Sequence, residues 1–283
     1  MLPPVTGSVR YEAADGVATL TLDRPDRLNT IDPALARDLE GCLDRAEEDA
    51  AVRVIRLRGE GRVFCAGYDI GWGAELMEAS EAGQPWDPMA DLRMMSRFVS
   101  TYMRLWRSPK PVVSQVHGFC VGGGTDLALC SDLIVCADDC RIGYPPARVW
   151  GSPTTSMWIY RLGLERAKRL LLTGDALDGV KAVEWGLASE HHPAAELDAG
   201  ALALCARIAL LPSNQLHMMK VLVNQAYDQM GLPTTQLIGT LLDGAARHTP
   251  EGQAFSEAAM KDVRAAVEGR DRPFGDYGQE GRR

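Results

Sequence analysis

The sequence predicts an α/β fold over residues 1–192, followed by a helical region over residues 193–283. In the first part, short apolar runs typical of buried strands alternate with amphipathic helical segments. Strand, helix and strand follow one another there in the order that parallel pairing with a crossover requires. In the second part nearly every segment has helical periodicity, with breaks at Pro212 and at residues 231–233. We therefore expect an α/β core that carries the site and a C-terminal helical region.

The N-terminal elements are marked by local signals. Residues 8–22 alternate in polarity around Asp15-Gly16, which predicts a β-hairpin. Asp32 before Pro33 predicts the start of a helix that runs to about Asp49, because Asp can cap a helix and Pro suits its first position. The apolar run at residues 52–57 predicts the next strand, paired in parallel with the hairpin.

Residues 71–90 contain Gly, Glu, Met, Pro and Trp without a clear period, which predicts a mobile loop or lid. A helix is expected after it over residues 91–107, ended by Pro109 and Pro111. Short strands are expected at residues 132–137 and 188–192. In the tail, Leu216, Met219, Leu222 and Val223 form an apolar stripe at helical spacing, which predicts core or subunit packing.

The central stretch, residues 111–132, combines a strand, a glycine turn and a helix start. Val112, Val113 and Val116 form the apolar run, and Gly122 to Gly124 open the helix. Without Cβ atoms the backbone can approach a ligand closely, and the N–H groups of a first helical turn attract negative charge. No Gly-Lys-Ser/Thr follows and the G-x-G-x-x-G spacing is absent, which argues against nucleotide motifs. The stretch predicts a backbone cradle beside the carboxylate of Asp126.

Composition limits the partners. The formal net charge is −8, which argues against nucleic acid or an anionic membrane as the main partner. The first residues lack the pattern of a signal peptide and no apolar stretch is long enough to span a bilayer, so a cytoplasmic protein is expected. The seven cysteines include no C-x-x-C pair, so we expect reduced core residues and no metal site.

Several segments together resemble the crotonase, or enoyl-CoA hydratase/isomerase, superfamily. The resemblance covers nearly the whole chain and depends on the order of the segments. They are Leu22-Asp23-Arg24-Pro25 with Leu28-Asn29, residues 54–58 leading into Phe64-Cys65-Ala66-Gly67-Tyr68-Asp69-Ile70, His117-Gly118 with Gly122 to Gly124, residues 171–174 with 182–187, and Glu251-Gly252 with Ala254-Phe255.

The resemblance implies a crotonase-like spiral of ββα units with a C-terminal helical region that builds a homotrimer or a dimer of trimers. It also implies an acyl-CoA thioester substrate, with coenzyme A as part of the substrate and no separate cofactor. Thioester chemistry at Cα or Cβ passes through an enolate-like oxyanion, which preorganised N–H donors stabilise. By resemblance, those donors are the backbone amides of Tyr68 and Gly123. The alternative is that these glycine turns only let the chain turn and pack.

Other residues are assigned to the substrate. By resemblance and position, we expect the acyl pocket to include Ala66, Gly67, Gly122, Tyr144, Trp150 and Phe255. Arg24, Arg27 and Arg62 are the candidates for the phosphates of coenzyme A, with surface solvation as the alternative. Asp69 is interpreted as a structural carboxylate in a turn, and His117 as a strand-end histidine bonded to backbone.

The acid–base residues depart from the family pattern. Hydratases of this family use two glutamates, one after the glycine run and one in the turn after the next strand. Those positions are Asp126 and Pro146 here, and Pro146 cannot carry a proton. Members that shift double bonds in dienoyl-CoA carry an Asp at the first position, but also carboxylates at positions that are Pro146 and Thr154 here. Asp126 is therefore the catalytic candidate, or else a helix-start Asp that the dipole favours.

Three functions remain open from the sequence. The first is a hydratase, isomerase or related lyase that acts through an enolate, with Asp126 transferring protons. The second is an acyl-CoA-binding protein that has lost turnover, which Pro146 suggests. The third is a serine hydrolase built on Ser114 and His117, although no Asp is placed to complete such a site.

Overall fold

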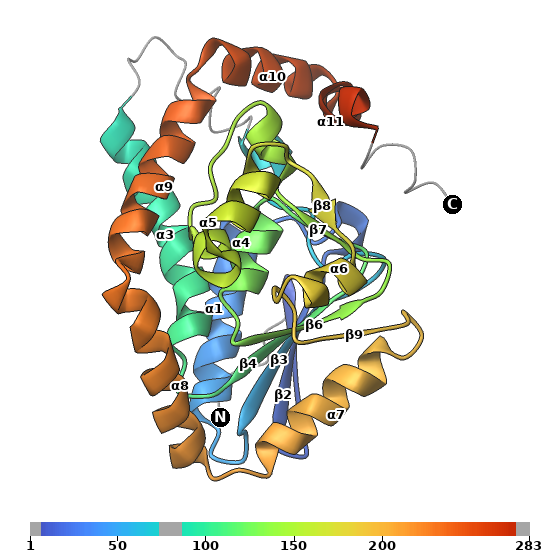
Figure 1. Cartoon of the computed structure of the whole chain (residues 1–283), viewed down its shortest axis with the longest axis vertical. Helices are drawn as coiled ribbons and strands as arrows, with labels where there is room; N and C mark the ends of the chain where they lie inside the picture. The colour runs from blue at the N-terminus through green and yellow to red at the C-terminus, as the bar shows by residue number, and fades with distance from the viewer. Residues whose placement is uncertain (1–6, 74–86, 276–283) are drawn as a thin grey trace.

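The computed structural model describes residues 7–73 and 87–275, and Figure 1 shows their arrangement. One sheet has the strand order β1-β2-β3-β4-β6-β9, and a smaller sheet has the order β5-β7-β8. The strands are β1 (Val9–Ala14), β2 (Val17–Leu22), β3 (Val54–Gly59), β4 (Val112–Val116), β5 (Phe119–Val121), β6 (Leu133–Ala137), β7 (Arg141–Gly143), β8 (Ala176–Leu177) and β9 (Glu190–His192).

The predicted N-terminal elements are confirmed. β1 and β2 form an antiparallel hairpin around Asp15 and Gly16, both of which adopt positive φ. Helix α1 (Pro33–Glu48) begins where expected, with the Asp32 side chain accepting a hydrogen bond from the N–H of Leu35 at 2.9 Å. The chain then returns as β3, which pairs in parallel with β2. This crossover places α1 against the sheet and starts the spiral.

The central stretch folds as a strand, a glycine turn and a short helix. β4 pairs in parallel with β3 on one side and β6 on the other, so it lies in the middle of the larger sheet. β5 then leaves that sheet for the smaller one, and α4 (Gly123–Leu129) begins within the glycine run. Every residue of α4 is buried. The glycine run therefore lies between the two sheets in the interior of the molecule.

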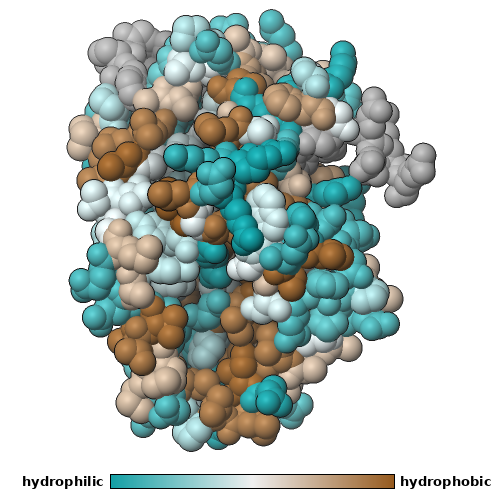
Figure 2. All heavy atoms as spheres, viewed as in Figure 1, coloured by the Kyte–Doolittle hydropathy of each residue, from teal (hydrophilic) through white to brown (hydrophobic). Residues whose placement is uncertain are grey.

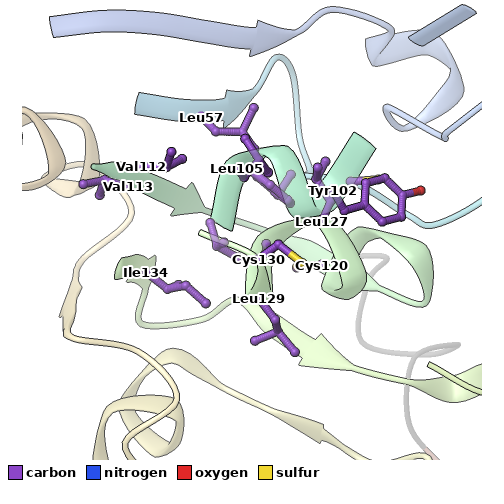
Figure 3. Close-up of a cluster of buried hydrophobic side chains, with 14 of the residues drawn as sticks. Leu57, Tyr102, Leu105, Val112, Val113, Cys120, Leu127, Leu129, Cys130 and Ile134 are labelled. Carbon is purple, nitrogen blue, oxygen red and sulfur yellow. The ribbon is translucent and has the colours of Figure 1, made fainter. Parts of the chain in front are cut away.

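The core is continuous from the larger sheet to α3 (Pro88–Arg107) and α4 (Figure 3). Leu57, Val113 and Ile134 from the strands and Leu105 and Leu127 from the helices are all at most 1% exposed. All seven cysteines are free and buried, as expected from their apolar surroundings. This packing fixes α4, and with it the glycine run, relative to the sheet.

Helices complete the chain. They are α5 (Met157–Leu171), α6 (Gly179–Glu184), α7 (Leu197–Ala209), α8 (Ser213–Gln229), α9 (Leu232–Arg247), α10 (Pro250–Lys261) and α11 (Val263–Asp271). α7 packs on the larger sheet, whereas α9 runs beside α3, and α10 and α11 cross one end of the molecule (Figure 1). α9 and α3 together form one wall of the molecule, which brings C-terminal side chains to the central region.

The outer surface of α8 and α9 is apolar in this single chain. Of the predicted stripe, Leu216 is buried, whereas Met219, Leu222 and Val223 are 46%, 66% and 66% exposed. Hydrophobic side chains also gather at the end of the molecule where α7 and α8 meet (Figure 2), where Leu210 is exposed.

The predicted loop at residues 71–90 falls mainly on residues 74–86, which lie outside the described residues. Its last part is helical, because α3 begins at Pro88 and is capped by the Asp87 side chain. Among the described helices, none is long and apolar enough to cross a lipid bilayer.

Candidate active site

A cavity of about 1150 Å³ opens between the glycine run and the C-terminal helices. Its walls come from residues 66–73, from the glycine run, from the turn at residues 144–151, from the start of α3, and from α9, α10 and α11. Of the residues expected to bind substrate, Ala66, Gly67, Gly122, Tyr144, Trp150 and Phe255 all line this cavity, as do Tyr68 and Gly123. The structure therefore brings together segments that lie far apart in the sequence.

Two glycine turns meet at the floor of the cavity. Cys65 and Cys120 pair as an isolated parallel bridge, with the Cys65 N–H donating to Phe119 and the Val121 N–H donating back to Cys65. Beyond this bridge both chains turn, Gly67 with φ of +97° and Gly122 with φ of +55°. The bridge holds Tyr68 and Gly123 on the same cavity wall.

The backbone N–H groups of Tyr68 and Gly123 have no acceptor among the described residues. Their neighbours are satisfied, since Asp69 N–H donates to Ile31 and Gly122 N–H donates to Gly143. Both residues line the cavity, so a ligand there could supply the acceptor that the protein does not. Their role as donors to a substrate oxygen stays a prediction.

The Tyr68 ring covers Gly123. A Cβ on Gly123 would lie 2.8 Å from Cε2 of Tyr68, so no side chain fits at position 123. The ring also meets Phe98 edge to face, with centroids 5.4 Å apart. The hydroxyl of Tyr68 is buried without a hydrogen-bond partner among the described residues, and the same holds for Tyr102 and for the Thr154 hydroxyl. Burial raises the pKa of Tyr68 well above its ordinary value.

Asp126 is fully buried and does not line the cavity. Its Oδ1 accepts hydrogen bonds from the N–H and the hydroxyl of Thr155, at 3.0 and 2.7 Å, and not from the N–H groups of α4. Its Oδ2 has no partner among the described residues. Burial raises the pKa of the Asp126 carboxyl to about 7, although the Thr155 hydrogen bonds oppose this change. Its role in proton transfer stays a prediction.

Pro146 lies where the pattern of the family places a second carboxylate. Its ring packs between two glycines: a Cβ on Gly122 would lie 3.4 Å from Cγ of Pro146, and one on Gly151 would lie 3.1 Å from its Cβ. The aromatic side chains of Tyr144 and Trp150 flank it on the cavity wall, and Trp150 packs on Phe255 with ring centroids 5.8 Å apart. At position 146 itself the wall therefore presents a proline ring, which cannot carry a proton.

The three candidate arginines differ in position. Arg24 pairs with Asp32 at 2.8 Å and with Asp69 at 3.2 Å, and is only 12% exposed. Arg27 lines the cavity and is 67% exposed. Arg62 is exposed and does not line it. Asp69 acts as the structural carboxylate that its turn predicted, because it accepts from the N–H groups of Gly71 and Trp72.

Sequence reasoning missed a charged cluster on the opposite wall. Asp243 and Arg247, one turn apart on α9, form a buried ion pair, and Arg247 also binds Asp91 of α3 at 2.6 Å. All three line the cavity. The i, i+4 spacing of Asp243 and Arg247 was the only available signal, and it is common on solvated helices. Only the packing of α9 on α3 turns the pair inward.

The residues of the hydrolase alternative lie apart. Ser114 is buried within the sheet, where its hydroxyl bonds to that of Ser131 at 2.5 Å. His117 bonds through Nε2 to the carbonyl oxygen of Gly61 at 2.9 Å, which confirms it as a strand-end histidine bonded to backbone. The geometry gives Ser114 no base.

Comparisons with known proteins agree with this architecture. Residues 12–270 match the sequence model of the family described as enoyl-CoA hydratase/isomerase. The chain is similar to a 1,2-epoxyphenylacetyl-CoA isomerase of Escherichia coli, with 32% identity over 75% of this chain and 79% of the relative. It is also similar to a hydroxycinnamoyl-CoA hydratase-lyase of Pseudomonas fluorescens, with 30% identity over 67% of this chain and 68% of the relative. A crystal structure of an enoyl-CoA hydratase from Mycobacterium smegmatis superposes with a TM-score of 0.91 and 45% identity, covering 96% of this chain and 95% of that one.

Proposed function

Because the chain belongs to the enoyl-CoA hydratase/isomerase family of the crotonase superfamily, we propose that it converts an acyl-CoA thioester through an enolate intermediate. One observation carries the proposal: the N–H groups of Tyr68 and Gly123, both on the cavity wall, have no acceptor among the described residues. The thioester oxygen would accept both hydrogen bonds, and its negative charge would grow as the enolate forms.

The two donors stabilise the transition state more than the ground state. They are backbone groups held by the bridge between Cys65 and Cys120, so they need no reorganisation when charge develops. Removing one such donor typically lowers kcat by about 10²–10³-fold. Close packing around Gly67, Gly123 and the Tyr68 ring keeps the two donors in place.

The cavity walls support an acyl-CoA substrate, with coenzyme A entering only as part of it. The acyl group would lie against the rings of Tyr144, Trp150 and Phe255. Of the three arginines, we place only Arg27 at the phosphates of coenzyme A, because it is exposed and lines the cavity. Arg24 is already held by two carboxylates.

Asp126 is the proton carrier that the family pattern supports. Its unpaired Oδ2 and its pKa of about 7 fit a group that exchanges a proton near neutral pH. Its burial behind the cavity wall does not fit direct contact with a substrate.

A second candidate is an acyl-CoA-binding protein without turnover. Pro146 favours it, because a hydratase needs protons transferred at both oxygen and carbon and this turn offers no carboxylate. A binding protein would keep the cavity and the two donors but would release the thioester unchanged.

We propose that the chain assembles as a homotrimer or a dimer of trimers through the apolar face of α8 and α9. Exposed side chains of that face are Met218, Met219, Val221, Leu222, Val223, Met230, Leu237, Ile238, Leu241 and Leu242. A cluster of exposed apolar side chains of this size on a single chain is typical of a subunit interface.

One experiment separates the enzyme from the binder. The protein is incubated in D₂O with panels of saturated and α,β-unsaturated acyl-CoA thioesters, and deuterium uptake at Cα and loss of enoyl absorbance are followed. The proposal expects exchange or turnover for at least one thioester. Binding, seen as a rise in Tm, without exchange or turnover would favour the acyl-CoA-binding protein over the enzyme. No rise in Tm with any thioester would contradict both.

A further inference from the structure

Asp243 is a carboxylate that the C-terminal helix α9 brings to the cavity, beside the turn that lacks one. A Cβ on Gly151 would lie 3.6 Å from Oδ1 of Asp243, 3.6 Å from the hydroxyl of Tyr144 and 3.1 Å from Cβ of Pro146. All four residues line the cavity. Because Gly151 has no side chain, two polar oxygens face one small open space next to the Pro146 ring.

This space is close to the two backbone donors. The Pro146 ring touches Gly122 on its other side, and Gly122 directly precedes Gly123. The Pro146 ring is thus a common neighbour of Gly151, beside Asp243, and of the donor turn at Gly122. A thioester whose oxygen accepts from Tyr68 and Gly123 has its Cα one bond from the carbonyl carbon. Asp243 lines the same cavity as these donors.

The carboxylate is held in one orientation. Oδ1 accepts from the N–H of Ser152 at 3.3 Å, and Oδ2 pairs with Arg247, whose other nitrogen binds Asp91. Burial raises the pKa of Asp243 above its ordinary value, and Arg247 opposes this change. The hydrogen bond and the ion pair fix the carboxylate in place, and burial makes it more basic than an exposed carboxylate, as a general base requires.

We propose that Asp243 is the catalytic acid–base residue of this cavity and replaces the carboxylate that the Pro146 turn lacks. This inference rests on the proposed enolate chemistry. Asp243 takes the proton from Cα, the electron pair of the C–H bond forms the enolate double bond, and the charge moves to the oxygen held by Tyr68 and Gly123. A proton from the Asp243 carboxyl group, which can first exchange with solvent, then returns to Cα, or to Cγ of an unsaturated acyl group, so that no other reactant is consumed.

Asp126 is the competing candidate, and position separates the two. Asp126 lies in α4 but does not line the cavity. The first residue of that helix, Gly123, is covered by the Tyr68 ring. Asp243 lines the cavity. General acid–base catalysis requires the carboxylate to come within hydrogen-bond reach of the reacting atom, and of the two carboxylates only Asp243 is on the cavity wall.

The test compares Asp243→Asn with Asp126→Asn and Asp132→Asn in the full-length protein. Asp243→Asn leaves Arg247 paired with Asp91, so the variant keeps no unpaired buried charge and should fold. Asp132 is the control, because it is a half-buried carboxylate that is also in an ion pair, with Lys220 at 2.8 Å, but lies away from the cavity. Exchange at Cα in D₂O, kcat, KM and acyl-CoA binding are measured for each.

We expect Asp243→Asn to lower the exchange rate and kcat by about 10²–10⁴-fold while acyl-CoA binding is retained. Asp132→Asn should leave the exchange rate and kcat within a few-fold of wild type. Formate added to Asp243→Ala should restore part of the exchange, which a merely structural role would not allow. Wild-type rates in Asp243→Asn, with loss in Asp126→Asn, would overturn the proposal while the enolate chemistry stands. Absence of exchange and turnover in the wild type would overturn both.

Discussion

A Cβ atom on Gly67 would lie 3.3 Å from the backbone nitrogen of Gly123 and 3.0 Å from the carbonyl oxygen of Val121. The two turns of the site therefore meet through a glycine contact that admits no side chain. Gly67 also has φ of +97°, a conformation that strains any L-residue. We predict that Gly67→Ala pushes the two N–H donors apart and lowers kcat/KM by about 10²-fold or more, measured on whichever thioester the wild type converts.

Gly163→Ala is the matched control for backbone strain. Gly163 has φ of +73°, but a Cβ there would meet nothing within 4 Å, and the residue does not line the cavity. Both variants should lose stability through strain, whereas only Gly67→Ala should lose activity in the fraction that stays folded. Equal activities in the two variants would show that the contact between Gly67 and Gly123 does not set the donor geometry.

The buried carboxyl of Asp126 predicts a pH dependence of stability. Burial raises its pKa from 3.8 to about 7, so the native state binds this proton more tightly than the unfolded chain does. Between about pH 4 and pH 7 the unfolded state loses the proton while the native state keeps it, so this group lowers the free energy of unfolding as pH rises. The whole effect is on the order of 4 kcal/mol and is complete above about pH 7.

The Asp126→Asn variant has no carboxyl group at this position, so it should lack this decrease in the free energy of unfolding. The free energy of unfolding, measured by urea denaturation from pH 4 to pH 8, should fall less steeply with pH in Asp126→Asn than in the wild type. The free energy of unfolding of the variant minus that of the wild type should increase as pH rises and level off above about pH 7. A difference that stays constant with pH would mean that Asp126 titrates in its ordinary range.

Local signals in the sequence predicted much of the fold. Asp15-Gly16 and Asp32-Pro33 fixed the hairpin and the start of α1, because turns and caps depend on neighbouring residues alone. The glycine run and the segment ending at Asp69 placed Tyr68 and Gly123 on one wall, and the crotonase fold implied by the resemblance is confirmed by the structural match. Backbone features that carry a sequence motif can be predicted in this way.

The charged wall could not be predicted, because it depends on how distant helices pack. Asp243 lies more than one hundred residues beyond the glycine run, on a helix whose sequence fits a solvated face equally well. The surroundings of Asp126 show the same limit. Its place after the glycine run suggested a helix-start carboxylate, whereas its partner is Thr155, which only the fold brings near. Side-chain environments formed by long-range contacts leave no local pattern.

The exposed apolar face of α8 and α9 predicts an assembly that one charge should disrupt. Leu222 is 66% exposed on that face. Burying an unpaired carboxylate in an apolar interface is strongly unfavourable, so Leu222→Asp should shift the protein toward smaller species in light scattering coupled to size exclusion. Leu172→Asp, at a residue that is 81% exposed beyond the end of α5, is the control. A wild-type protein that is monomeric at micromolar concentration would contradict the proposed interface.

Arg148 anchors the Pro146 turn to the C-terminal helices, so its removal should lower stability. It is 1% exposed, pairs with the equally buried Asp271 at 3.0 Å, and lies over the Phe274 ring at 3.9 Å. Asp271 keeps its ion pair with Arg270 at 2.7 Å, so Arg148→Met removes hydrogen bonds to charged groups without leaving Asp271 unpaired. The variant should lose about 1–3 kcal/mol of stability, seen as a lower urea midpoint, and should raise KM, because the turn and Asp271 both line the cavity. Arg264→Met removes an arginine that is 75% exposed and pairs with Glu268, and should barely move the midpoint. Equal midpoints for the two variants would show that the turn is held by its prolines rather than by Arg148.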